Sequence, residues 1–158
     1  MDIRVGYGYD VHQMVEGREL WLGGVLFEHE KGALGHSDAD VLLHAICDAI
    51  LGAAGLRDIG FQFPDTDAQF KGIDSKKLLQ STLDKINAEK WKVNNIDATV
   101  NLERPKILKR VEDMKSIIAS ICNIETNAVS IKATTGEKMG FVGREEGVEA
   151  SAVVLLTR

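Results

Sequence analysis

The sequence is poor in cysteine and has no long apolar run. Its 158 residues include two cysteines, Cys47 and Cys122, and both lie in apolar patterns typical of helices. This low count excludes a disulfide-stabilised scaffold, and we expect two buried, reduced thiols in a reducing compartment. No apolar stretch approaches the ~18 residues of a membrane-spanning helix, and the first residues lack the uninterrupted apolar stretch of a signal peptide. We therefore expect a cytoplasmic protein with no membrane partner.

Excess positive charge is also absent. Lysine and arginine number 19 against 24 aspartates and glutamates, which gives a formal net charge of −5. This balance provides no field that would attract nucleic acid or an anionic membrane, and we expect neither as a partner. A negatively charged ligand would instead be held by local groups or by metal ions.

Two nucleotide-binding motifs are missing as well. The glycines of "GYGYD" (residues 6–10) lack both the third glycine and the following helix of a dinucleotide-binding fingerprint. No P-loop is present, and no serine or cysteine stands in a recognisable nucleophile motif. The sequence alone leaves a catalytic triad open, because triad residues meet in space rather than in sequence.

The apolar pattern that is present predicts one domain, residues 1–158, with strands and helices interleaved. Strands are predicted at 3–9, 19–28, 95–103, 128–135 and 148–157. Helices are predicted from an N-cap at Ser37 to the glycines at 52–55, from Asp74 to about 86, and from about Pro105 to Cys122. The pattern predicts an α+β class (a two-layer α/β arrangement), with a mixed sheet that carries helices on one face. The last strand is apolar on both faces, so we expect a neighbouring subunit to cover its other side.

A metal site is indicated by two segments that are far apart in sequence. Asp10 and His12 share a face of the first strand, because positions i and i+2 of a strand point the same way. His44 lies in the first helix, where Asp40 and Asp48 are its i±4 neighbours. Two histidines and one aspartate would leave one open position on zinc, which is typical of catalytic sites, and Asp48 could orient an imidazole. A polar strand end and a solvated helix face remain the alternative.

Three further segments could carry function. In "HSDAD" (36–40), His36 precedes an expected helix N-terminus that would attract an anion, although Ser37 could simply cap the helix. The acidic, aromatic loop 58–67 could bind a ligand or merely connect two elements. The glycine-rich loop 133–147 offers hydroxyls and amides for phosphate, Glu137 for a divalent metal and Arg144 for an anion; a solvated hairpin is the alternative.

Five motifs together resemble one enzyme family over essentially the whole chain. They are "GYDVH" (8–12), "HSDADVLLHAICDAILGAAGLRDIGFQFPDTD" (36–67), "DSKKLL" (74–79), "ERPKIL" (103–108) and "KATTGEKMGFVGREEG" (132–147). The family is that of 2-C-methyl-D-erythritol 2,4-cyclodiphosphate synthase, from the non-mevalonate pathway of isoprene biosynthesis. The resemblance implies a phosphorus–oxygen lyase that cyclises 4-diphosphocytidyl-2-C-methyl-D-erythritol 2-phosphate and releases CMP. It also implies a homotrimer whose three sheets pack around a threefold axis, with active sites at the subunit interfaces.

The resemblance assigns roles to individual residues. It implies one zinc per subunit on Asp10, His12 and His44, and a magnesium or manganese ion on Glu137. His36 and Thr135 would steady the transition state. The residues expected to contact the phosphate and the erythritol are Ser37, Asp58, Ile59, Gly60, Phe63, Pro64, Asp65, Thr66 and Asp67. Those expected in the cytidine pocket are Leu102, Pro105, Lys106, Ile107, Leu108, Ala133 and Thr134, beside Thr135. Tyr9, Phe141 and Arg144 match positions around a central apolar cavity that can hold an isoprenoid diphosphate.

The chain departs from the family pattern in a few places. Gly136 stands where the family often has threonine or asparagine, and Glu103 and Arg104 replace smaller or less charged residues. Two other functions stay open beside the synthase. One is a zinc-dependent phosphodiesterase or phosphatase in which zinc activates water, and the other is a non-catalytic trimeric binding protein.

Overall fold

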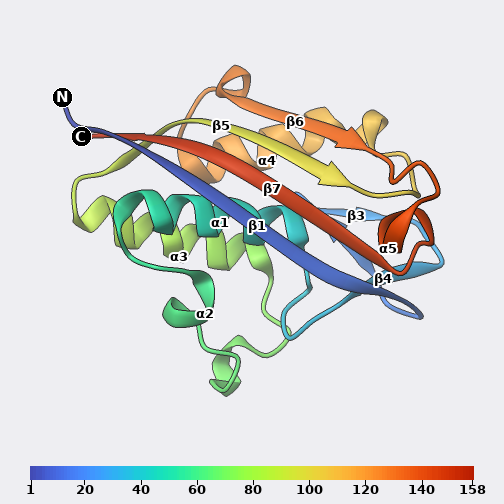
Figure 1. Cartoon of the computed structure of the whole chain (residues 1–158). Coiled ribbons are helices and arrows are strands. Elements are labelled where there is room, and N and C mark those ends of the chain that lie inside the picture. Colours follow the sequence, from blue (N-terminus) through green and yellow to red (C-terminus); the bar gives the residue numbers. More distant parts are fainter.

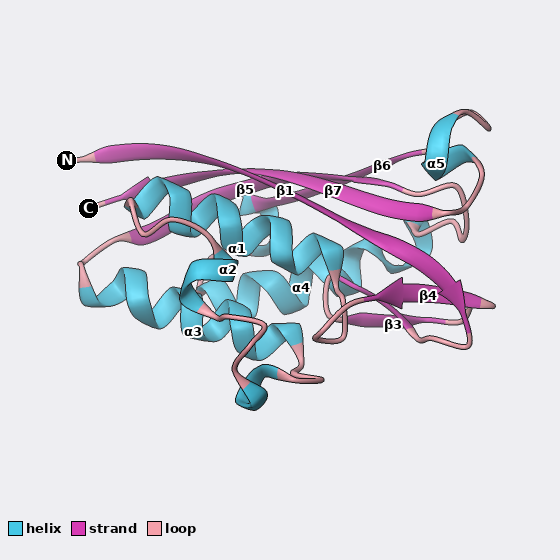
Figure 2. Cartoon of the chain, turned by 60° about the horizontal axis from the view of Figure 1, so that its bottom comes forward, coloured by secondary structure: helices cyan, strands magenta, loops and turns pink.

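The computed structural model describes residues 1–158 and shows a sheet with helices packed on one face (Figure 2). The sheet has five strands in the order β4-β1-β7-β5-β6. They are β1 (Ile3–Glu16), β4 (Lys31–Leu34), β5 (Lys92–Asn101), β6 (Val129–Thr134) and β7 (Gly147–Thr157). β5 and β6 run parallel, whereas the other neighbours run antiparallel. The predicted mixed sheet of an α+β fold is confirmed.

Three long helices form the second layer (Figure 1). They are α1 (Val41–Ala54), α3 (Ser75–Ala88) and α4 (Val111–Cys122). α1 lies directly under the sheet and α3 lies farther from it (Figure 2), so 12 residues of α1 are buried. The remaining elements are short: β2 (Leu20–Leu22), β3 (Val25–Phe27), α2 (Ile59–Gln62), η1 (Ala68–Phe70), η2 (Leu108–Arg110), η3 (Thr126–Ala128) and α5 (Gly140–Gly143). None of these helices is long and apolar enough to cross a membrane.

Two glycines of β1 let α1 approach the sheet closely. A Cβ atom on Gly6 would lie 1.8 Å from the carbonyl oxygen of Ala49, and one on Gly8 would lie 1.9 Å from that of Ala45. Any larger residue would therefore push the helix away from the strand. This contact fixes the distance between α1 and β1, and with it the position of His44 relative to Asp10 and His12 of β1.

The two faces of the sheet differ in their environment. The helix-facing residues of β7 are buried in a core cluster of 37 residues. On the opposite face of β1, Val5 and Tyr7 are 66% and 65% exposed. Ile3, Tyr9, Val11 and Val153 are also exposed on this side. The apolar character of the last strand therefore reflects one face buried by helices and one face that a single chain leaves open.

Several predicted boundaries were wrong. Residues 19–28 form a hairpin, β2 and β3, because Gly23 and Gly24 take left-handed φ angles of 59° and 79°. The N-cap of α1 is Asp40, whose carboxylate accepts from the backbone N–H of Leu43, and not Ser37. α4 begins at Val111 rather than near Pro105; it has no side-chain cap, so the sequence carries no strong start signal there.

Other predictions held or needed only extension. Asp74 caps α3 as expected, and Cys47 and Cys122 are free and buried. Burial raises the pKa of the Cys122 thiol to about 12. β1 continues beyond residue 9 to Glu16, and β4, which the sequence analysis missed, pairs with that extension. The acidic loop 58–67 contains α2, and the glycine-rich loop 133–147 contains α5.

Candidate metal centre and adjoining pockets

Asp10, His12 and His44 meet on the helix side of the sheet. Asp10 Oδ2 lies 2.9 Å from His12 Nε2 and 3.0 Å from His44 Nδ1, and the two nitrogens are 3.2 Å apart. In tetrahedral zinc, with bonds of roughly 2.0–2.1 Å, ligand atoms lie about 3.3 Å from one another. The three atoms therefore fit one face of such a tetrahedron, and they form a group that could hold a divalent metal.

The ionisation of these residues suits a cation. Burial opposes the charge on Asp10, but hydrogen bonds from His12 and His44 outweigh it and lower the pKa of the carboxyl to about 2. Burial also opposes a charged His44, yet the bond and the charge of Asp10 raise the pKa of this imidazole. The carboxylate attracts a positive charge into this site, and a metal ion would compete there with a proton.

A second set of contacts orients His44. Its Nε2 lies 2.9 Å from Ser75 Oγ and 3.1 Å from Ser37 Oγ. The Ser75 hydroxyl donates its proton to Asp38, so its oxygen accepts from Nε2–H. Nδ1 bonds Asp10 through a proton when no metal is present, and it would offer its lone pair there to a metal ion that replaced this proton. The chain Asp38–Ser75–His44 thus selects the tautomer that a metal needs.

Asp48 does not take the orienting role that the sequence analysis expected. Its Oδ1 accepts from the backbone N–H of Ile59 at 2.8 Å and so fixes the start of α2. Asp40 is fully buried and accepts from the backbone N–H groups of Gly23, Gly24 and Leu43. Burial raises the pKa of the Asp40 carboxyl, against the effect of these donors. The polar stripe on α1, for which a solvated helix face was the alternative, is buried at Asp40 and His44 and partly buried at Asp48. Its two carboxylates organise neighbouring turns.

A pocket of about 370 Å³ opens beside the three potential ligands. Nine of the residues that the sequence analysis proposed line it: Asp10, His12, His36, Ser37, His44, Ile59, Gly60, Phe63 and Asp65. Gly35, Phe70, Ile73 and Leu78 also line it and were missed, because they carry no polar signal. Asp58 and Asp67 instead cap α2 and η1, and Pro64 and Thr66 are exposed outside the wall. His36 lies in the loop before α1 rather than at the helix N-terminus itself.

The residues of the expected cytidine pocket gather around a different cavity of about 350 Å³. It is lined by Leu102, Glu103, Pro105, Lys106, Ile107, Leu108, Ala133, Thr134, Thr135 and Glu137. Glu103 accepts from the backbone N–H of Gly136 at 2.9 Å and so ties the glycine-rich loop to this cavity. A Cβ atom on Gly136 would lie 2.6 Å from Gly143 N, which explains the glycine at this position. Thr135 Oγ1 donates to Glu137 Oε1 at 2.9 Å.

These two pockets share no residue within one chain. His36 belongs to the first pocket, and Thr135 and Glu137 belong to the second. β1, which carries Asp10, and β6, which leads to Thr135, are separated in the sheet by β7 and β5. With strands about 4.8 Å apart, this separation is roughly 14 Å. A single chain therefore does not bring the two halves of the expected site together.

The expected central-cavity residues lie toward the open face of the sheet. Tyr9 OH donates to Glu149 at 2.7 Å, and this bond raises the pKa of Tyr9 to about 12. Asn101 donates to the same carboxylate. Phe141 contacts a small pocket that includes Glu149, and the Arg144 guanidinium is paired with Glu146 at 2.9 Å.

One further group of potential ligands was missed by the sequence analysis: His29, Glu30 and Glu145. The Arg104 guanidinium donates to Glu145 at 2.5 Å and to Glu30 at 2.7 Å. Its bonds lower the pKa of Glu145. The two carboxylates are therefore already neutralised by a cation of the protein itself, unlike Asp10, whose contacts are two imidazoles.

Comparisons with known proteins identify the family of the chain. A model of the YgbB family matches residues 3–157. The 2-C-methyl-D-erythritol 2,4-cyclodiphosphate synthase of Phocaeicola vulgatus is 61% identical over the full length of the chain and 99% of its own length. The bifunctional IspDF of Campylobacter jejuni matches with a TM-score of 0.94 and 43% identity over 98% of this chain, which spans 42% of that protein. The CDP complex of IspF from Plasmodium falciparum matches with a TM-score of 0.84 and 34% identity, over 98% of this chain and 95% of that one. The chain therefore belongs to the YgbB family.

Proposed function

We propose that the chain is a 2-C-methyl-D-erythritol 2,4-cyclodiphosphate synthase. It converts 4-diphosphocytidyl-2-C-methyl-D-erythritol 2-phosphate to the cyclic diphosphate and releases CMP, which makes it a phosphorus–oxygen lyase of isoprene biosynthesis. The observation that carries this proposal is the cluster of Asp10, His12 and His44 beside a pocket, in a chain 61% identical to a synthase of that name. A relative of the same fold has been solved with CDP, which supports a cytidine nucleotide as part of the substrate.

The reaction needs no nucleophile from the protein. An oxygen of the substrate's 2-phosphate forms a bond to the β-phosphorus, and the bond from that phosphorus to the CMP oxygen breaks. Such transfers depend on positioning and on neutralising charge at the phosphate oxygens. Zinc held by Asp10, His12 and His44, with magnesium or manganese on Glu137, would supply this electrophilic stabilisation.

The residues of the chain supply the positioning. Ser37 and His36 lie where a phosphate beside the three ligands would be bonded, and Asp65 and the backbone of Gly60 line the part of the pocket suited to the erythritol hydroxyls. In the second pocket, Pro105 to Leu108 and Ala133 to Thr135 would hold the cytidine. The Thr135 hydroxyl would bond an oxygen of the diphosphate, where negative charge develops as CMP leaves.

We further propose that the protein is a homotrimer with active sites at its subunit interfaces. Two features support this assembly: the open apolar face of the sheet, and the division of the expected site between two pockets that share no residue. A neighbouring copy would cover the open face of the sheet and would bring its own second pocket against the metal centre of this chain. Phe141 and Arg144 would then face a central cavity that accepts an isoprenoid diphosphate. The two free, buried cysteines suit a cytoplasmic location.

The experiment that tests the proposed function is incubation with the cytidyl substrate, followed by phosphorus NMR. We expect CMP and the cyclic diphosphate in equal amounts. Inorganic phosphate or linear products would instead identify a zinc-dependent phosphodiesterase or phosphatase. Absence of turnover with zinc and magnesium present would leave a binding protein and contradict the proposal.

A further inference from the structure

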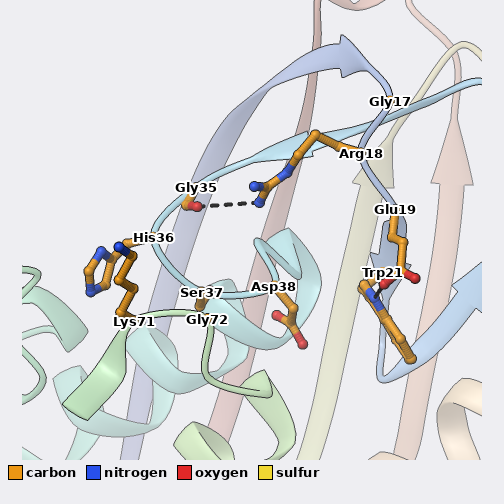
Figure 3. A pocket seen from close by; sticks show the side chains of 10 residues that line it. All are labelled: Gly17, Arg18, Glu19, Trp21, Gly35, His36, Ser37, Asp38, Lys71 and Gly72. Carbon is orange, nitrogen blue, oxygen red and sulfur yellow. Dashed lines mark hydrogen bonds between the residues drawn. The ribbon is translucent and has the colours of Figure 1, made fainter. Parts of the chain in front are cut away.

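A cavity of about 510 Å³ lies beside the loop that precedes α1 (Figure 3). Its wall holds two cations, Arg18 and Lys71, and two carboxylates, Glu19 and Asp38. The formal charges of the wall cancel, so charge gives this cavity no preference for an anion. The charged residues that act on a loop of the proposed active site lie elsewhere, just beyond the end of β5.

Two adjacent residues after β5 hold the glycine-rich loop near both of its ends. Glu103 accepts from the backbone N–H of Gly136 at 2.9 Å and from that of Lys138 at 3.3 Å. Arg104 donates to both carboxylate oxygens of Glu145, at 2.5 and 2.9 Å. Because neighbouring residues bind the loop at two separate points, they fix its placement relative to the wall of the second pocket.

The turn that Glu103 binds has a strained backbone. Glu137 and Lys138 take left-handed φ angles of 53° and 61°, although neither is a glycine. Such conformations are unfavourable for L residues and persist where surrounding contacts enforce them. The two N–H groups that Glu103 accepts from stand on either side of Glu137. The Glu103 carboxylate is therefore the side chain that holds this turn in its strained form.

The same turn orients the two side chains that the proposed function places at the diphosphate. Thr135 Oγ1 donates to Glu137 Oε1 at 2.9 Å and accepts from the backbone N–H of Glu137 at 3.3 Å. The hydroxyl and the carboxylate thus move together with the backbone of the turn. Glu103 lines the second pocket beside them, but both of its carboxylate oxygens are engaged by the loop.

We propose that Glu103 is a positioning residue for the reaction, because it holds Thr135 and Glu137 where the diphosphate would lie. The inference rests on the proposed function, in which residues 105–108 hold the cytidine. Since Glu103 belongs to the same short segment, its bonds set the distance between the nucleoside end and the diphosphate end of the site. A displacement of about 1 Å at such a group costs roughly 100-fold in rate. Glu103 itself transfers no proton.

The test compares Glu103→Ala and Glu103→Gln with the wild type. In Glu103→Ala we expect kcat to fall roughly 10- to 100-fold, whereas KM should change less than about threefold because the walls of the cytidine pocket remain. Glu103→Gln keeps one acceptor oxygen, so its kcat should lie between the two. Hydrogen–deuterium exchange over residues 134–143 should be faster in Glu103→Ala, because two amides lose their acceptor. Arg104 still binds the other end of the loop, so the variant should fold.

Glu89→Ala is the matched control, because Glu89 is exposed at the end of α3 and lines neither pocket. A kcat within about twofold of the wild type in Glu103→Ala, with an active wild type, would overturn the inference and leave the proposed function intact. A loss confined to KM would also overturn it, since Glu103 would then act only on cytidine binding. Unchanged exchange over residues 134–143 would show that Glu103 does not hold the turn. A wild type that forms no cyclic product would refute the proposed function, and the positioning role would fall with it.

Discussion

His44 is the residue at which three elements meet, because its Nδ1 faces Asp10 on β1 while its Nε2 faces Ser37 and Ser75. His44→Ala should reduce zinc well below one equivalent per chain by elemental analysis and lower kcat by several decades. The side chain is buried, and its loss leaves the hydroxyls of Ser37 and Ser75 without this partner. The free energy of unfolding should therefore fall by about 1–3 kcal/mol. This loss is smaller than the free energy of unfolding of a typical domain, roughly 5–15 kcal/mol, so the variant should remain folded.

His29→Ala is the informative companion, because His29 belongs to the other group of potential ligands. Arg104 already neutralises the carboxylates of that group, so this variant should keep its zinc and its turnover. Loss of zinc in His29→Ala but not in His44→Ala would show that the metal binds at His29, Glu30 and Glu145, and this result would contradict the proposed mechanism. Joint loss of zinc and folding in His44→Ala would identify a structural metal instead.

Ser75 carries a separate prediction, because it contacts His44 but not the metal ligand atoms. Ser75→Ala removes the nearer of the two hydroxyls at His44 Nε2, the one whose own proton is given to Asp38, and we expect zinc affinity to fall roughly 10- to 100-fold. Competition with a chromogenic chelator measures this change directly. Ser81→Ala, on the same helix, should leave the affinity unchanged. Equal affinities in Ser75→Ala and in the wild type would refute the orienting role.

At the scale of elements, the contact between β1 and α1 sets the metal geometry. Gly8→Ala places a Cβ atom against the carbonyl of Ala45. We expect a loss of about 3 kcal/mol in the free energy of unfolding, measured by urea denaturation, and weaker zinc binding as α1 moves. Gly52→Ala is the control within α1, because no atom lies within 4 Å of its added Cβ; it should be neutral or stabilising by up to ~1 kcal/mol. A Gly8→Ala variant as stable as the wild type would show that the helix has room to adjust.

The elements also show what the sequence can predict. Asp10 and His12 follow from the two-residue period of a strand, and His44 follows from a helix whose pattern is strong. Ser75 and Asp38 carry no such signal, because their connection exists only after α3 docks beside the loop that precedes α1. The start of α4 was misplaced for a related reason: Ile107 is buried by tertiary packing, which extended the apolar pattern beyond the helix.

At the scale of the whole molecule, the open face of the sheet predicts association. Val5 and Tyr7 are exposed large hydrophobic residues on this face. In the proposed trimer the open faces of three subunits pack together, and a charged side chain introduced there would lose its hydration without gaining a partner. Tyr7→Glu should therefore shift the protein from trimer to monomer in sedimentation velocity, with loss of activity. Lys77→Glu, which changes an exposed residue of α3 in the helix layer, should not. A wild type that sediments as a monomer at micromolar concentration would contradict the trimer.

Shared active sites make a stricter prediction, which two inactive variants can test. His44→Ala damages the metal centre, whereas Thr135→Ala damages the other pocket, and the two pockets have no residue in common. If each site joins the metal centre of one subunit to the second pocket of its neighbour, a mixed trimer contains some sites with both halves intact. A site then works only if its metal centre comes from a Thr135→Ala subunit and its second pocket comes from a His44→Ala subunit. After random reassembly of equal amounts each condition is met at about half of the interfaces, so about a quarter of the wild-type activity should return. If each chain held a complete site of its own, every site would carry one lesion, and mixing would restore nothing.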